Sequence, residues 1–204
     1  MKQNDNKQFW ERVAKLYTPL QEKGNKELYQ QAIEYIKEHL SKDMNVLEIA
    51  SGTGQFTFPL CDCVAQYEAT DFSKKMINES KKIRSKGITY SVQDATQLTY
   101  NDNHFDAVII ANALHIMPNP SKALNEIYRV LKNDGIVIAP TFIYEGKMNK
   151  FRLWIMEKAG FKTFHKWTKQ SYTTFIQQHH FEIIKSTVLN GNLLPECIVI
   201  ARRK

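Results

Sequence analysis

Apolar runs alternate with amphipathic segments along most of this chain, and that order restricts the fold more than any other feature. Residues 28–40 show the helical spacing, because Leu28, Ala32, Ile36 and Leu40 recur on one face. The apolar runs that alternate with such segments are NVLEIA, YEAT, ITYSV, FDAVII and GIVIAPTF. Alternation of this kind predicts a parallel sheet with helices on both faces.

Two further apolar runs, FEIIKSTVL and LLPECIVIARR, follow near the C-terminus and are connected differently. Only a short turn signal, Asn190-Gly191-Asn192, lies between them. A parallel pair needs a crossover of about a dozen residues or more, so this turn requires antiparallel pairing. We therefore expect a mostly parallel sheet with an antiparallel strand near one edge. Helical patterns near 148–159 and 168–179 precede this hairpin.

Capping residues predict several helix ends. Ser73 is the expected N-cap of the polar helix SKKMINESKKIRSK, and Gly87 its expected stop. Asn119 and Pro120 are the expected N-cap and first helical residue of the next amphipathic segment. We expect that helical region to end at Gly135.

The composition is that of one soluble globular domain. The chain has 204 residues, of which 43% are hydrophobic and 24% charged. No apolar stretch reaches about 18 residues and the N-terminus has no signal-peptide core, so we expect a cytoplasmic protein without a transmembrane segment. The three cysteines, Cys61, Cys63 and Cys197, are an odd and small number, so we expect no disulfide framework. They have no partner pair at metal-ligand spacing, so we expect no metal site.

The net charge of +7 would fit an anionic partner, but the basic residues are dispersed and alternate with acids. This pattern favours solvated faces, and we expect no nucleic acid partner. Peripheral contact with an anionic membrane and the oligomeric state stay open.

Polar side chains stand at the same end of successive predicted strands. Glu48 lies in the first run, Asp71 follows the second, Asp94 the third and Asn112 the fourth. The carboxyl ends of parallel strands share one edge, where ligands bind at the reversal of strand order. A carboxylate after the second strand can accept both hydroxyls of a ribose, and one after the third can accept from an adenine amine. Taken singly, Asp71 and Asp94 would also fit as caps of a helix and a turn.

The loop after the first strand carries Gly52 and Gly54, which allow the backbone to approach a ligand closely. A dinucleotide fingerprint, G-x-G-x-x-G/A, would need a small residue where Thr57 stands. Glu48 would also repel a pyrophosphate and attract a cationic ligand. The loop therefore favours a cation or an amine, and an NAD dehydrogenase is the least favoured enzyme.

Together these motifs resemble those of the class I S-adenosylmethionine-dependent methyltransferases of the small-molecule type. The matching segments lie within residues 30–203 and are VLEIASGTG, ATDFS, VQDATQLTY, FDAVIIANALHIM and LKNDGIVIAPTF. The resemblance implies an α/β, Rossmann-like, doubly wound sheet of seven mostly parallel strands with an antiparallel C-terminal hairpin strand. It also implies S-adenosyl-L-methionine as cofactor and S-adenosyl-L-homocysteine as product.

The resemblance also implies a set of cofactor-binding residues. They are Tyr17, Glu48, Ala50, Ser51, Gly52, Gly54, Asp71, Phe72, Met76, Asp94, Ala95 and Asn112. Glu48 would face the amino-acid end of the cofactor, Asp71 the ribose, and Asn112 the space beneath the sulfonium. Tyr17 would lie over the cofactor, with a core aromatic as the alternative. Ser51 stands where many relatives have Cys or Gly, a conservative difference.

Methyl transfer requires alignment of nucleophile, methyl carbon and sulfur, and needs a base only when the nucleophile arrives protonated. His115 and His165 are the candidate catalytic bases, with cofactor stacking and a surface position as their alternatives. Residues 142–167 are rich in aromatic side chains, which favours a small apolar or aromatic acceptor, methylated at O, N or S. The same side chains would also fit the core of a lid.

We expect one methyltransferase domain over 1–204. Its parts would be an N-terminal helical cap (1–42), a cofactor-binding core (43–142), substrate-side helices (143–180) and the C-terminal hairpin (181–204). Two alternatives stay open: a phospholipid N-methyltransferase, and a non-catalytic module that binds an adenosyl ligand. No N-P-P-Y-like element follows the fourth strand, which disfavours methylation of nucleic-acid bases.

Overall fold

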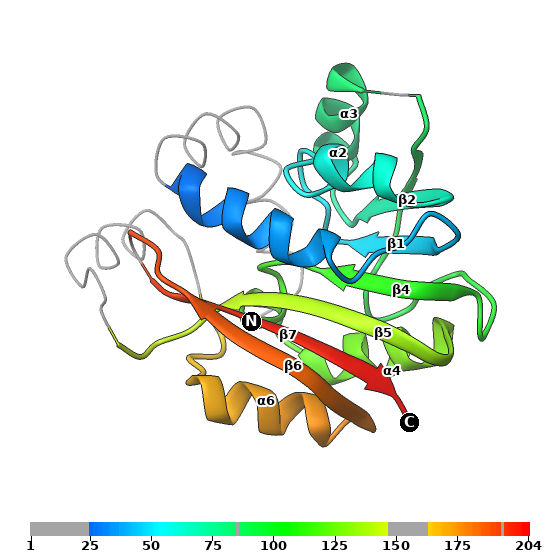
Figure 1. The fold of residues 1–204 in the computed structure, drawn as a ribbon. Helices are drawn as coiled ribbons and strands as arrows, with labels where there is room; N and C mark the ends of the chain where they lie inside the picture. Colours follow the sequence, from blue (N-terminus) through cyan, green and yellow to red (C-terminus); the bar gives the residue numbers. More distant parts are fainter. Residues whose placement is uncertain (1–24, 85, 147–162, 193) are drawn as a thin grey trace.

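The computed structural model describes residues 25–84, 86–146, 163–192 and 194–204. Within these residues seven strands form one sheet, in the order β3-β2-β1-β4-β5-β7-β6 (Figure 1). The strands are β1 (Asn45–Ile49), β2 (Gln66–Asp71), β3 (Thr89–Val92), β4 (Phe105–Ile110), β5 (Leu131–Phe142), β6 (Phe181–Leu189) and β7 (Glu196–Arg203).

The pairing of the strands confirms the predicted fold class. β1 pairs in parallel with β2 and β4, β2 with β3, and β4 with β5. β7 is inserted between β5 and β6 and is antiparallel to both. The short connection at residues 190–195 thus imposes the antiparallel step that the turn signal predicted.

Helices cover both faces of the sheet, as the alternating pattern predicted. They are the helix at residues 25–37, α2 (Thr57–Leu60), α3 (Lys74–Ile83), α4 (Pro120–Val130) and α6 (Lys169–Gln177), with short 3-10 turns η1 (Cys61–Cys63) and η2 (Leu114–Ile116). One core cluster packs the helix at 25–37 and α2 against one face. The other packs α4 and α6 against the opposite face, and Figure 1 shows the helix at 25–37 lying across the sheet, away from α6.

The structure confirms the predicted helix starts and corrects two ends. The side chains of Ser73 and Asn119 accept from backbone N–H groups and cap α3 and α4, with Pro120 at the first helical position. α3 ends at Ile83, before Gly87. α4 ends at Val130 and not at Gly135, because Leu131 already pairs with Phe105 of β4. An irregularity in that ladder then precedes Ile136, so the KNDG segment belongs to the start of β5 and not to the helix.

Two predicted features, Tyr17 and the helical pattern at 148–159, lie outside the described residues. In the described ranges, no helix is both long enough and apolar enough to cross a bilayer.

Candidate active site

A cavity of about 250 Å³ lies at the carboxyl ends of the central parallel strands. Strand order reverses at this place, because β1 has β2 on one side and β4 on the other. The sequence-predicted residues that line the cavity are Glu48, Ala50, Ser51, Gly52, Asp71, Phe72, Met76, Asp94, Ala95 and Asn112. The structure therefore brings most of the predicted set to one place, while their contact with a cofactor stays a prediction.

Asp71, at the end of β2, holds the glycine loop. The Gly52 N–H donates to Asp71 Oδ2 over 3.0 Å, and the Ser73 N–H donates to Oδ1 over 2.8 Å. Burial raises the pKa of Asp71 to about 6, although these two hydrogen bonds oppose the shift. Asp71 thus binds the N-cap residue of α3 and lines the cavity at the same time, so the two interpretations of this residue are compatible.

The two loop glycines have different surroundings. Gly52 has φ +55, and a Cβ built on it would meet no atom within 4 Å. Gly54 has φ +98, and its Cβ would lie 2.4 Å from Phe58 Cζ and 2.8 Å from Ser80 Oγ. Gly52 therefore presents bare backbone to open space, as a bound ligand requires. Gly54 is needed for packing against α2 and α3, and it is not among the lining residues.

Glu48 is buried in β1 and has two hydroxyl partners. Thr57 Oγ1 donates to Glu48 Oε2 over 2.5 Å, and the Tyr67 hydroxyl donates to the same oxygen over 2.9 Å. Burial raises the pKa of Glu48 to about 7, the two hydrogen bonds lower it, and the Asp71 charge raises it. Thr57 stands where the dinucleotide fingerprint needs a small residue, and the structure explains its presence. Its hydroxyl donates to the carboxyl group of Glu48, which would repel a pyrophosphate.

Asp94 lies at the exposed rim of the cavity, after β3. Its Oδ1 accepts from the Thr96 N–H over 2.9 Å and from the Thr96 hydroxyl over 2.7 Å. Asp94 therefore caps its own turn, as one alternative proposed, and also lines the cavity beside Ala95.

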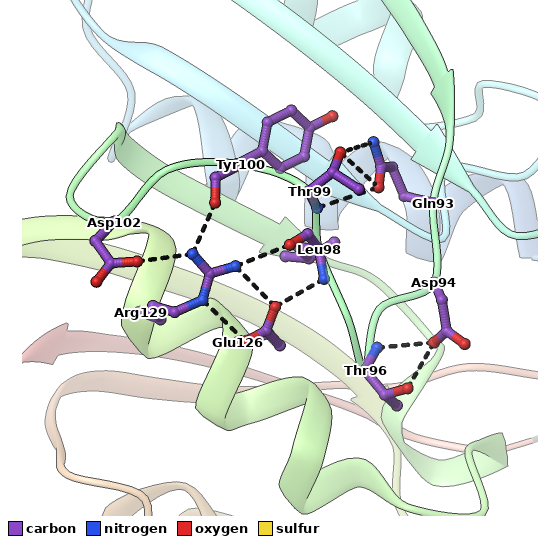
Figure 2. A network of polar contacts seen from close by, with 9 residues as sticks. All are labelled: Gln93, Asp94, Thr96, Leu98, Thr99, Tyr100, Asp102, Glu126 and Arg129. Carbon is purple, nitrogen blue, oxygen red and sulfur yellow. Dashed lines mark hydrogen bonds and ion pairs between the residues drawn. The ribbon is translucent and has the colours of Figure 1, made fainter.

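Arg129 of α4 fastens the loop that continues from Asp94, and Figure 2 shows this network. Its guanidinium donates to the carbonyl oxygens of Tyr100 and Leu98, over 2.7 and 2.9 Å. It also binds the carboxylates of Asp102 and Glu126, each at 2.8 Å. Glu126 in turn accepts from the Leu98 N–H over 2.7 Å. Two backbone carbonyls and one N–H of the loop are thus held by side chains of a single helix turn.

We expect Arg129→Lys to loosen the loop without unfolding the protein, because lysine keeps the charge but not the planar fork of donors. The loss should be about 1–2 kcal/mol and local. Hydrogen exchange followed by mass spectrometry should show faster exchange over residues 94–102. The matched control is Arg84→Lys, since Arg84 forms a similar bidentate pair with Asp62. Equal exchange in this segment in both variants would contradict the prediction.

Asn112 follows β4 and has a left-handed backbone with φ +53. Its N–H donates to Pro140 O over 2.8 Å, and its side-chain Nδ2 donates to Glu196 Oε1 over 2.6 Å. The sequence analysis did not find Glu196, because it lies 84 positions from Asn112 and no local pattern connects the two.

The two candidate bases lie close together but do not line the cavity. His115 Nδ1 is 2.9 Å from Thr141 Oγ1, and the His115 carbonyl oxygen accepts from the His165 N–H over 3.1 Å. Burial, followed by the charge of His165, lowers the pKa of His115 to about 3. An imidazole whose pKa is lowered in this way is a weaker proton acceptor, which disfavours His115 as a base, and its catalytic role stays a prediction. His165 stacks on Trp167, and its role stays a prediction.

The aromatic residues expected on the acceptor side are only partly described, as Phe142, Tyr144, Phe164 and Trp167, and none of these lines the cavity. Trp167 stacks on Phe175 of α6, and Tyr172 and Ile176 of α6 belong to the core. α6 therefore covers the sheet and does not line this cavity, and its assignment to the substrate side stays a prediction.

Several lining residues were not predicted. Thr53, Gln55 and Phe56 extend the glycine loop, and Met117 and Lys122 lie on the far side after β4. Thr53, Gln55 and Phe56 adjoin predicted residues, so their position in the same loop was the available signal. Lys122 lies in α4, and no local pattern pointed to it. In the part of the chain that the structure describes, no group of three or more potential metal ligands occurs, and the three cysteines are free thiols.

Comparison with known proteins gives a consistent result. Residues 47–139 match the family model described as a methyltransferase domain. A demethylmenaquinone methyltransferase of Renibacterium salmoninarum is 39% identical over 97 residues, which cover 48% of this chain and 40% of that protein. A SAM-dependent methyltransferase of Thermotoga maritima superposes with a TM-score of 0.77 at 19% identity, covering 96% of this chain and 98% of that one. One from Methanosarcina mazei has a TM-score of 0.68 at 20% identity, covering 83% and 96%.

The strand order and the superpositions show a Rossmann-like fold shared with solved class I methyltransferases, which confirms the predicted fold class. The match to the methyltransferase family model covers residues 47–139, just under half of the chain. The similar solved structures that are named SAM-dependent methyltransferases agree with the expected cofactor, S-adenosylmethionine. The matched segment spans only about two fifths of the length of the curated relatives, so their activity does not transfer directly to this chain.

Proposed function

We propose that this protein is an S-adenosylmethionine-dependent methyltransferase that acts on a small, apolar or aromatic acceptor. The observation that carries the proposal is the convergence of Glu48, Asp71 and Asp94, from three neighbouring strands, on one cavity beside the bare backbone of Gly52. Carboxyl groups around an open loop suit an adenosyl ligand with a cationic end, whereas they would repel a pyrophosphate.

The proposed cofactor contacts follow from the positions of the lining residues. Asp71 would accept from the ribose hydroxyls, and Asp94 and Ala95 would meet the edge of the adenine. Glu48 and Asn112 would lie toward the amino-acid and sulfonium end. Most of the lining belongs to the proposed core at 43–142, with Tyr29 added from the preceding helix, which supports the proposed division into core and cap.

S-adenosylmethionine, when bound, supplies a methyl group already activated on a sulfonium. The contribution of the protein is then to hold the cofactor, to exclude water and to align the acceptor. Burial lowers the pKa of His115, which makes this histidine a weak proton acceptor. The proposed acceptor is therefore one whose nucleophilic atom does not depend on His115 for deprotonation.

The names of the relatives suggest an acceptor class. Several are demethylmenaquinone methyltransferases, and one from Desulfotalea psychrophila is named a ubiquinone/menaquinone biosynthesis C-methyltransferase. A quinone-like acceptor agrees with the apolar or aromatic molecule expected from the sequence. It also adds carbon to the O, N and S atoms considered as methyl acceptors. A cytoplasmic location remains part of the proposal.

The test is transfer from methyl-labelled S-adenosylmethionine to a panel of demethylated quinones, phenols, thiols and amines. We expect label in the quinone or phenol class. Label in phosphatidylethanolamine vesicles alone would instead support a phospholipid N-methyltransferase. Cofactor binding without transfer to any acceptor would support the non-catalytic module. Absence of binding to both the cofactor and its demethylated product at millimolar concentration would remove the proposal.

A further inference from the structure

The Asn112–Glu196 pair contains two buried oxygens that lack a partner. Asn112 Nδ2 donates to Glu196 Oε1 over 2.6 Å. In the described part of the chain, neither Asn112 Oδ1 nor Glu196 Oε2 has a hydrogen-bond partner, and both atoms are buried. These are the remaining oxygens of an amide and a carboxyl group that are already joined through their other polar atoms.

The surroundings of Glu196 are unfavourable for a charge. It is the first residue of β7, is 0% exposed, and lies opposite Phe142 of β5 and Leu189 of β6 in the sheet. An ionised carboxylate offers about four acceptor positions, and a single amide donor would leave most of them unsatisfied. A buried group in this situation loses its charge unless it gains partners.

We propose that Glu196 binds Asn112 as a carboxylic acid, in a cyclic acid–amide pair, and that it is a positioning residue for the wall of the cavity. The protonated Oε2 donates to Asn112 Oδ1, while Asn112 Nδ2 donates to Oε1. One proton then provides a partner for both oxygens that otherwise have none. The functional part of this inference rests on the proposed binding of an adenosyl cofactor in the cavity.

The electrostatic environment supports the acid form. Burial raises the pKa of Glu196 to about 7, and the hydrogen bond from Asn112 opposes that shift. No charged side chain of the described residues contributes to the pKa of Glu196. The titratable groups that sense Glu196 are Cys197 on the same strand and Tyr172 of α6, and burial raises the pKa of both. Neither is a cation that would stabilise the carboxylate.

The pair matters for the cavity because Asn112 belongs to its lining and has a strained backbone, with φ +53. When Glu196 loses its proton, two acceptor oxygens face each other without a hydrogen between them. The Asn112 side chain then keeps one hydrogen bond in place of two. We therefore expect cofactor affinity to fall as pH rises through the titration of Glu196.

The decisive variant is Glu196→Gln, which makes the same two hydrogen bonds but cannot lose a proton. S-adenosylhomocysteine is titrated into wild type and E196Q by calorimetry, from about pH 5 to about pH 9. We expect wild-type affinity to fall about fivefold or more relative to E196Q affinity on the alkaline side, while the two proteins bind alike near pH 5. Glu48 and Asp71 titrate in both proteins, so the difference between the two profiles isolates Glu196. Identical profiles would overturn the proposal.

Thermal unfolding tests the pair without a ligand. Because the folded chain binds the Glu196 proton more tightly, wild type should lose stability relative to E196Q as pH rises from 4.5 to about 7. The two proteins should melt together near pH 5, and wild type several degrees lower near pH 8. Glu182→Gln, an exposed change on β6, is the control and should follow wild type at every pH.

The titration and the melting profiles distinguish a failure of the proposed function from a failure of the acid–amide pair. If S-adenosylhomocysteine fails to bind at any pH, the proposed function fails, while the melting profiles still decide the acid–amide pair. If E196Q melts below wild type at pH 5, or does not fold, glutamine is no substitute for the acid and the pair is refuted. If the melting temperatures of E196Q and wild type change with pH in parallel, folding does not raise the pKa of Glu196, and the pair is also refuted.

Discussion

Asp71→Asn is expected to weaken the binding of S-adenosylhomocysteine about 100-fold, because it removes a charged acceptor proposed to bind two ribose hydroxyls. The variant keeps the shape of the side chain and one oxygen that can accept from the loop. Asp71 receives the N–H groups of Gly52 and Ser73, so a modest loss of stability should accompany the loss of affinity. Calorimetric titration measures the first effect and thermal unfolding the second.

The pH dependence adds a second test of the same residue. Burial raises the pKa of Asp71 to about 6, so the wild-type carboxyl becomes protonated, and binding weaker, as pH falls through that value. The asparagine variant should lack this acid limb. Asp43→Asn is the matched control, because Asp43 is exposed and its carboxylate accepts from Ser41 at the surface. An Asp71→Asn dissociation constant within about twofold of wild type would exclude a contact between this carboxyl and the ligand.

Alanine at Gly54 and at Gly52 should give opposite patterns of stability and affinity. At Gly54 the added Cβ must displace the ring of Phe58, 2.4 Å away, on a backbone with φ +98 that alanine rarely adopts. We expect a loss of about 3 kcal/mol in the free energy of unfolding. At Gly52 only the left-handed backbone opposes alanine, at a cost of about 1 kcal/mol.

Among folded molecules, Gly52→Ala should lose more affinity for the ligand than Gly54→Ala, the reverse of the order expected for stability. The Cβ of Gly52→Ala points into open space beside the cavity, so it should reduce affinity for S-adenosylhomocysteine by about tenfold or more. Gly54→Ala, measured at a temperature at which it is folded, should lose less affinity. Melting temperatures and titrations of the two variants side by side make the comparison. A Gly52→Ala protein that binds like wild type would show that the ligand does not approach this stretch of backbone.

The fold was predictable because its determinants are local. Apolar runs, caps such as Ser73 and Asn119, and the turn at residues 190–192 each act over a few residues. Together they predict a mostly parallel sheet with an antiparallel strand near one edge, which the structure shows. The end of α4 was not predictable in this way. Leu131 leaves the helix because it pairs with Phe105, which is remote in sequence, and a terminator such as Gly135 carries no information about that pairing.

The site was predictable where it follows strand ends and unpredictable where it depends on packing. Asp71 and Asn112 line the cavity because parallel strands bring their carboxyl ends to one edge. The roles of Arg129 and Glu196 arise from contacts between segments far apart in the chain, and their neighbours in sequence give no sign of them. The burial of His115 beside Thr141, which disfavours its proposed role as a base, was unpredictable for the same reason, since it is a property of the folded core.

A crystal structure of the protein with S-adenosylhomocysteine tests the central claim most directly. The expected result is a ligand in the cavity at the ends of β1, β2 and β4, with its ribose hydroxyls on Asp71 and its adenine beside Asp94 and Ala95. A ligand bound elsewhere, or one whose ribose and adenine touch none of these residues, would contradict the proposal that the converging carboxyl groups form an adenosyl site.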